Sequence, residues 1–327
     1  MKIADVLAKR QGQWLELERL CVVFEAKNAK LDAATVSRFA TLYRSACADL
    51  ALADSYRLPP STIQYLHRLV GRSHNQLYRS RGFEYSNWSR ILLEDVPKRI
   101  FSDGCVKVAF FLFWGIFLLS AFLAANPTMW PAFAEEILSA EQISQMEESF
   151  ANPIGGRNAS INPLMASFYI MHNTGIGLRC FVGGLLIIPG VLITMFNAAV
   201  LGASFGYMAR PDIAAGPNFF HFVTAHGPFE LTAIVLSAGA GLRLGVSWMK
   251  TDGLTRLSSI RKNASEAMPI MGAAMILFFL AALIEGFLSP SSAPYEIKAV
   301  VAMLSSGLLM FYFIVLGYPR GDDASAT

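Results

Sequence analysis

The sequence predicts an all-α, polytopic membrane protein in which six transmembrane helices follow a cytoplasmic helical domain. Two observations lead to this fold class. Of the 327 residues, 54% are hydrophobic and only 16% are charged, a composition too apolar for an ordinary soluble domain. The apolar residues also gather into separate runs of roughly 20 residues, the length that an α-helix needs to cross a bilayer.

Residues 1–82 are predicted to form the cytoplasmic helical domain. Apolar residues recur there at helical spacing in three stripes, and Pro59-Pro60 separates the second stripe from the third. Residues 1–20 carry charges throughout and no apolar leader segment, so we expect the N-terminus to stay in the cytoplasm. The stripes consist of Trp14, Leu17, Cys21 and Phe24; of Val36, Phe39, Leu42, Ala46 and Leu50; and of Ile63, Leu66 and Leu69.

Residues 83–104 are predicted to form an interfacial helix. Trp88, Ile91 and Ile100 alternate there with the basic residues Arg90 and Lys98, directly before the first apolar run. This mixture is typical of a helix that lies on the cytoplasmic headgroups of a membrane. A fourth helix of the preceding bundle would give the same pattern.

Residues 105–318 are predicted to form the six-span transmembrane domain, and residues 319–327 a cytoplasmic tail. The loop 126–162 carries five glutamates and one basic residue, which favours the extracytoplasmic side, whereas the basic segment 250–266 favours the cytoplasm. Alternating spans between these segments place both termini inside, as expected for a multi-pass protein of the bacterial inner membrane. The predicted spans are 106–125, 163–181, 182–207, 219–249, 268–289 and 297–317.

The fourth span contains the segment HGPFE at its outer end, with His226 and Glu230 four residues apart. Both side chains are costly at the edge of hydrocarbon, which indicates mutual pairing or a polar pocket. A proline is tolerated in the first turn of a helix. We therefore expect the span to be broken at Gly227-Pro228, with residues 219–226 forming a short re-entrant piece.

Further polar residues are expected in the outer half of the bundle or near its middle. Glu285 lies near the outer end of the fifth span and Asn197 in the outer half of the third, while His172 and Asn173 lie in the second span. Together with His226 and Glu230 they predict one outward-facing polar pocket. Asn173 and Asn197 can equally serve as hydrogen bonds between helices.

The histidine and glutamate residues leave three interpretations open. The first is a buried structural pair formed by His226 and Glu230. The second is a binding site for a substrate, a lipid headgroup or an ion. The third is a metal site, which requires His172, His226, Glu230 and Glu285 to converge; no other cofactor is expected. The spacing is not H-E-x-x-H, so it gives no metalloprotease signature.

Glycine and cysteine usage favour packing over chemistry. Gly202-x-x-x-Gly206 and Gly241-x-x-x-Gly245 permit close helix contacts, which we expect to lie within the bundle rather than at a dimer interface. The four cysteines stand far apart without C-x-x-C spacing, so the sequence predicts that they form neither a disulfide framework nor a zinc site.

Residues 172–207 and 226–245 resemble the core of the stage II sporulation protein M family of bacterial membrane proteins. Asn173, Asn197 and the HGPFE segment match the family pattern of two asparagines followed by His-Gly-x-x-Glu. Ala198 departs from it, because glycine is common at that place. The segment LYRSACADLALA, residues 42–53, is similar to the soluble domain of the longer, non-sporulation branch of the family.

The resemblance implies a scaffold rather than an enzyme, because the family's namesake holds cell-wall remodelling enzymes during engulfment. It implies MoxR-type ATPases and von Willebrand factor A-type proteins as partners, besides membrane lipid. An ABC-2-like permease subunit is the alternative, which would need a separate ATPase because the chain lacks G-x-x-x-x-G-K-[ST]. A metal-dependent intramembrane enzyme is the third hypothesis. Nucleic acid is not expected because no basic stripe is present, and a homodimer remains open.

Overall fold

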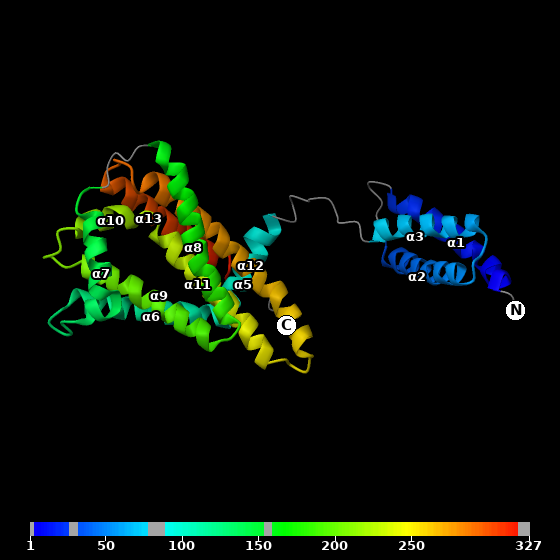
Figure 1. Ribbon diagram of the computed structural model, residues 1–327, viewed down its shortest axis with the longest axis horizontal. Coiled ribbons are helices and arrows are strands. Elements are labelled where there is room, and N and C mark those ends of the chain that lie inside the picture. The colour runs from blue at the N-terminus through cyan, green and yellow to red at the C-terminus, as the bar shows by residue number, and fades with distance from the viewer. Residues whose placement is uncertain (1–2, 26–31, 78–88, 154–158, 320–327) are drawn as a thin grey trace. The chain divides into compact units, whose positions relative to one another are not determined.

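The computed structural model describes residues 3–25, 32–77, 89–153 and 159–319, and every regular element within these ranges is a helix. The predicted all-α fold is therefore confirmed. The chain divides into two compact units, Met1–Glu84 and Tyr85–Thr327, which Figure 1 shows. Residues 83–88 of the predicted interfacial helix and residues 320–327 of the predicted tail lie outside the described residues.

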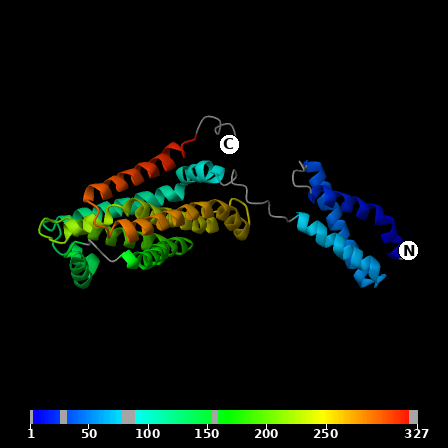
Figure 2. The ribbon, with the colours of Figure 1, turned by 90° about the horizontal axis from the view of Figure 1, so that it is seen from above.

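The N-terminal unit consists of α1 (Ile3–Glu25), α2 (Ala33–Ser55) and α3 (Pro60–Leu77), which Figure 2 shows from a second side. The three apolar stripes of the sequence supply its core. Asp32 starts α2 by accepting a hydrogen bond from the Thr35 N–H at 3.1 Å, a common helix cap. The buried apolar residues are Trp14, Leu17, Cys21, Phe39, Leu42, Ala46, Ala53, Leu66 and Leu69.

Polar contacts join the helices of this unit. Asp49 is fully buried on α2; it accepts a hydrogen bond from Trp14 Nε1 at 2.9 Å and forms an ion pair with Arg10. At the surface, Arg38 donates two hydrogen bonds to Glu16, at 2.8 and 2.6 Å, and lowers the pKa of that carboxyl group. Buried Asp49 is thus neutralised, as a charge in a core requires.

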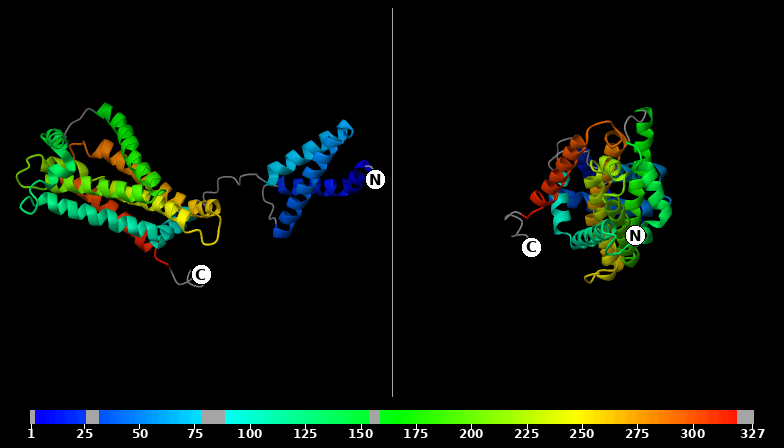
Figure 3. Two further views of the ribbon diagram at one scale, coloured as in Figure 1. Left: turned by 60° about the horizontal axis from the view of Figure 1, so that its bottom comes forward. Right: turned by 90° about the vertical axis from the view of Figure 1, so that its left-hand side faces the viewer.

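The second unit is a bundle of long helices that alternate in direction between its two ends (Figure 1). Figure 3 shows the bundle from two further sides. Short helical segments precede or extend some of the long ones. The long helices are α6 (Gly104–Ala125), α8 (Asn162–Gly184), α9 (Ile188–Met208), α11 (Gly227–Met249), α12 (Arg256–Leu283) and α13 (Tyr295–Met310). The short segments are η1 (Ile91–Asp95), α5 (Val96–Ser102), η2 (Ala159–Ile161), η3 (Ile284–Leu288) and η4 (Phe311–Val315).

Within the described ranges, five helices are long and apolar enough to cross a membrane: α6, α9, α11, α12 with η3, and α13 with η4. This makes the chain an all-α polytopic membrane protein. The remaining predicted span, residues 163–181, corresponds to α8, which has 23 residues but is not one of the five. His172, Asn173 and Arg179 lower its hydropathy, so the count of six stays a prediction.

Helix α11 lies at the centre of the bundle and packs against α6, α8 and α12. Of the residues in its apolar stretch, 78% are buried, against 28% for α6 and for α9. Gly241 on α11 approaches the backbone of Phe181 on α8, and Gly206 on α9 approaches that of Ala121 on α6. The two glycine motifs therefore serve packing within the chain, as the sequence predicts.

The acidic segment after α6, which the sequence predicts as a loop between two spans, contains a helix that the sequence analysis did not predict. It contains α7 (Phe133–Phe150), whose Ala134, Leu138 and Ile143 are buried. These apolar positions pack against the end of α9, and Tyr207 donates a hydrogen bond to Glu147 at 2.6 Å. The apolar positions between the glutamates allow the segment to fold onto one end of the bundle.

The basic segment at the opposite end is shorter than predicted. Helix α12 begins at Arg256 rather than near residue 268, because Thr255 Oγ1 caps it by accepting from the Ser258 N–H at 3.3 Å. The connection after α11 is therefore residues 250–255. Near this end Arg243 forms ion pairs with Asp103 and Glu266, which ties α11 to α6 and α12.

Candidate functional site

The helix break predicted at Gly227-Pro228 is present. Helix α10 (Gly216–Val223) ends one short turn before α11, which begins at Gly227 with Pro228 in its first turn. His226 occupies the capping position, and its carbonyl accepts the Glu230 N–H at 3.2 Å. This backbone bond belongs to the first turn of α11, which brings the two side chains to the same side of the helix.

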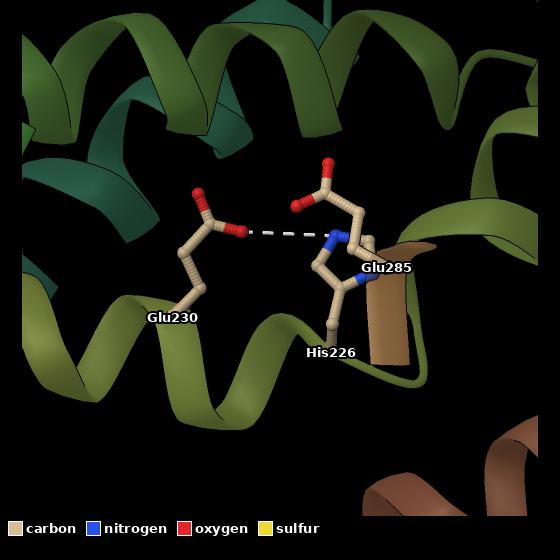
Figure 4. A group of neighbouring side chains, drawn as sticks. All are labelled: His226, Glu230 and Glu285. Atoms are coloured by element: carbon tan, nitrogen blue, oxygen red, sulfur yellow. Dashed lines mark ion pairs between the residues drawn. The ribbon is translucent and has the colours of Figure 1, made fainter. Parts of the chain in front are cut away.

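Three side chains converge at the break, as Figure 4 shows: His226, Glu230 and Glu285. Glu285 comes from η3, which follows α12. The Nε2 atom of His226 lies 3.7 Å from Oε2 of Glu230, and one ligand atom from each of the three residues lies within 4.8 Å of the others. The side chains of His226 and Glu230 are only 5% and 16% exposed.

Two further residues orient the side chains of this trio through hydrogen bonds. Asn173 on α8 is buried and donates a hydrogen bond from Nδ2 to Oε2 of Glu285 at 3.0 Å. Ser289 is fully buried just after η3, and its Oγ lies 2.9 Å from Nδ1 of His226. The site therefore joins α8, α11 and the end of α12 through buried hydrogen bonds.

Lys298 extends the polar network, and sequence reasoning missed it. It is fully buried; its Nζ donates to the carbonyls of Ser289 at 2.7 Å and Ser291 at 3.2 Å and lies 2.9 Å from Nδ1 of His221. A lysine within the first turn of an apolar span was an available signal, because an intramembrane cation needs partners. Nothing in the sequence marked Ser289 as a partner of His226.

Two of the predicted pocket residues lie elsewhere. His172 is exposed on α8, where its ring stacks on Phe168 with 5.8 Å between the ring centres. Asn197 is half-buried on α9 and donates a hydrogen bond to the Ile193 carbonyl of its own helix at 2.8 Å. The predicted set of four metal candidates is thus reduced to three. Asn197 also donates a hydrogen bond to Sγ of Cys180 on α8 at 3.9 Å, so it joins two helices, which is the alternative to a pocket that the sequence left open.

The trio is notable for its charges. Glu230 and Glu285 lie close together in a buried place, and no lysine or arginine among the described residues forms an ion pair with either. Two unscreened carboxylates cannot both be charged there without a positive partner. The arrangement can therefore hold a proton or a cation between the side chains.

An apolar pocket of about 400 Å³ borders the helix break. It lies between α6, α11 and α13 and is lined by Gly227, Pro228 and Leu231 among others. The trio is not part of the described lining of this pocket. The polar cluster and the apolar pocket therefore occupy separate places beside the break.

The fold and the site define a helical membrane protein with a buried polar centre at a broken helix. Residues 108–290 match the sequence model of the family described as Stage II sporulation protein M, and the chain belongs to this family. Residues 5–79 match a family described as a domain of unknown function. Comparison with curated proteins and with solved structures finds no match.

Proposed function

We propose that this chain is an assembly protein of the bacterial cytoplasmic membrane that holds partner proteins through its N-terminal unit. One observation carries the proposal: a helical unit with its own buried core is joined to a membrane unit within one chain. Membership of the stage II sporulation protein M family supports it, because the resemblance to this family implies a scaffold.

The surface of α1 supplies a face for a cytoplasmic protein. Leu15 and Val22 are 52% and 58% exposed, and their spacing of seven residues places them on one side of the helix. Leu15 also lines a groove of about 320 Å³ together with Trp14 and Tyr65. Exposed apolar residues beside a groove favour protein contact. By family resemblance, MoxR-type ATPases and von Willebrand factor A-type proteins are the first partners to test.

Glutamate substitutions on α1 test this proposal. We expect the Leu15→Glu/Val22→Glu variant to lose a partner that crosslinks to the wild-type chain in cells, with chain level and membrane insertion unchanged. Leu52→Glu is the matched control, because Leu52 is an exposed leucine of α2. Quantitative mass spectrometry of crosslinked complexes gives the measurement. Identical partners in wild type and double variant would refute the role assigned to α1.

The orientation in the membrane is part of the proposal. Lys250 begins the connection after α11 and Arg256 follows it, so we place this connection in the cytoplasm with both termini, and we place acidic α7 outside. Single cysteines at Asn152 and Leu254, in a chain without its natural cysteines, test this. A membrane-impermeant thiol reagent should label the first in cells with a permeabilised outer membrane and the second only after lysis. The reverse pattern would invert the topology.

Transport is the second candidate, and it is favoured by two buried carboxylates that have no lysine or arginine partner among the described residues. A permease that uses Glu230 and Glu285 to carry a cation or a substrate should lose flux in Glu230→Gln while its complexes assemble normally. An assembly protein should keep both its complexes and its cellular phenotype in that variant. Crosslinking and phenotype measured in the same strain separate the two functions.

A further inference from the structure

We propose that His226, Glu230 and Glu285 bind a divalent transition-metal ion of the Zn²⁺ class inside the membrane unit. The site is independent of the assembly role proposed above, because it lies in the other unit of the chain. Its three donors are one imidazole nitrogen and two carboxylates, which are common ligands of Zn²⁺.

The distances fit ligands of one ion better than they fit a hydrogen-bonded pair. Nε2 of His226 and Oε2 of Glu230 are 3.7 Å apart, longer than a hydrogen bond. Two ligands at about 2.1 Å from a tetrahedral ion lie about 3.4 Å apart. Since the three ligand atoms all lie within 4.8 Å of one another, the most distant pair must approach by only about 1.4 Å to reach that separation.

Charge gives a second, independent argument. Elsewhere in the membrane unit the carboxylates of Asp103 and Glu266 share an arginine, Arg243. Glu230 and Glu285 have no such partner among the described residues, and Lys298 directs its ammonium group to two carbonyls and His221 instead. A bound dication supplies the missing positive charge at this place.

The surrounding hydrogen bonds have the form that metal ligands need. When Nδ1–H of His226 donates to Oγ of Ser289, the lone pair of Nε2 faces the two carboxylates. Asn173 fixes Glu285 by donating to its Oε2, which leaves Oε1 free to turn toward the ion. Outer partners of this kind set the ring tautomer and the direction of the ligand.

The donor set also selects the kind of ion. Ca²⁺ takes six to eight oxygen ligands and Mg²⁺ keeps an octahedral shell, whereas this site offers one nitrogen and two carboxylates. An imidazole favours Zn²⁺ and its neighbours in the first transition row. Three protein ligands leave the fourth tetrahedral position for water or for an oxygen atom of a bound molecule.

Elemental analysis of the purified full chain tests the site. The chain should carry an affinity tag without histidines, be stripped with a chelator and then be dialysed against Zn²⁺. We expect about one tightly held ion per chain in the wild type. In Glu230→Gln and in Glu285→Gln the zinc content per chain should be lower by about tenfold or more. These substitutions keep the side-chain shape, and size-exclusion elution shows whether each variant stays folded.

Matched controls come from the same membrane unit. His172→Ala removes an exposed histidine of α8 and Glu266→Gln removes a carboxylate paired with Arg243, so both should keep the ion. Co²⁺ added in place of Zn²⁺ should give the intense visible absorption of a tetrahedral site in wild type and controls, and none in Glu285→Gln. A wild-type chain without tight Zn²⁺ or Co²⁺ binding, or folded glutamine variants that bind as well as wild type, would overturn the proposal.

Discussion

His226 and Ser289 are joined inside the membrane unit: Nδ1 of the ring lies 2.9 Å from Oγ of the serine, and 63 residues separate them in the chain. Both residues are buried, at 4% and 0% exposure. The contact links the break before α11 to the turn after η3. It therefore determines which ring nitrogen of His226 faces Glu230 and Glu285.

Ser289→Ala should weaken metal binding without abolishing it. The substitution removes the partner of Nδ1 and keeps all three ligands, so affinity should fall about 10- to 100-fold, the usual cost of losing such a partner. Competition with a chelator of known affinity gives the measurement. Ser291→Ala is the control, because the Ser291 hydroxyl donates to the Leu288 carbonyl and does not contact His226. Equal affinities in the two variants would contradict the role of Ser289.

Arg243→Met should destabilise the membrane unit more than Glu266→Gln does. Arg243 pairs with Asp103, whose side chain is 2% exposed, and with Glu266, whose side chain is 38% exposed. Stranding a buried charge costs about 3–5 kcal/mol, while an exposed pair contributes about 1 kcal/mol or less. Thermal unfolding of the detergent-solubilised protein should show this order. Equal shifts in the two variants would show that the ion pair with Asp103 adds nothing.

The fold was predictable to the extent that hydropathy and periodicity determine it. Runs of apolar residues located the five helices that are long and apolar enough to cross a membrane, and the proline in HGPFE located the helix break before α11. The start of α12 was missed because Arg256 and Lys262 indicated a loop, whereas the cap at Thr255 allows charged residues to begin a helix. The fold of α7 was missed for a similar reason: glutamates dominate it, and its buried apolar residues are few.

The candidate site was predictable only in part. Topology indicated that His226, Glu230 and Glu285 share one end of the bundle, and they converge there. Topology does not determine the rotation of a helix about its axis, so it could not separate Asn173, which reaches Glu285, from its neighbour His172, which points elsewhere. A one-residue step on a helix changes the direction of the side chain by about 100°.

Gly206→Ala should disrupt the contact between α6 and α9. A Cβ atom at this position would clash with the carbonyl oxygen of Ala121, which is backbone and cannot rotate away. Overpacking of this kind costs about 1–3 kcal/mol. Gly115→Ala is the control, because a Cβ there meets nothing within 4 Å. Thermal unfolding of both variants gives the measurement. An unchanged midpoint in Gly206→Ala would show that α6 and α9 can move apart to accommodate the methyl group without loss of stability.

Cys21 should react slowly with alkylating reagents in the folded N-terminal unit. Its side chain is fully buried beside Ser73, with Sγ 3.3 Å from Oγ, and burial raises the pKa of its thiol. Because the thiolate is the reactive form, both effects reduce the rate, and we expect it to be about tenfold or more below that of half-buried Cys47.

Chains that keep only one of the two cysteines provide the measurement, by mass spectrometry after timed exposure to iodoacetamide. Raising the pH should accelerate both reactions, and denaturant should make the two rates equal. Similar rates in the folded protein would show that α1 detaches readily from α3, since Cys21 becomes accessible only when that contact opens. A slow reaction at Cys21 alone would show that α1 stays packed against α2 and α3. The exposed residues Leu15 and Val22 then keep their place on the surface of the unit, where a partner could bind them.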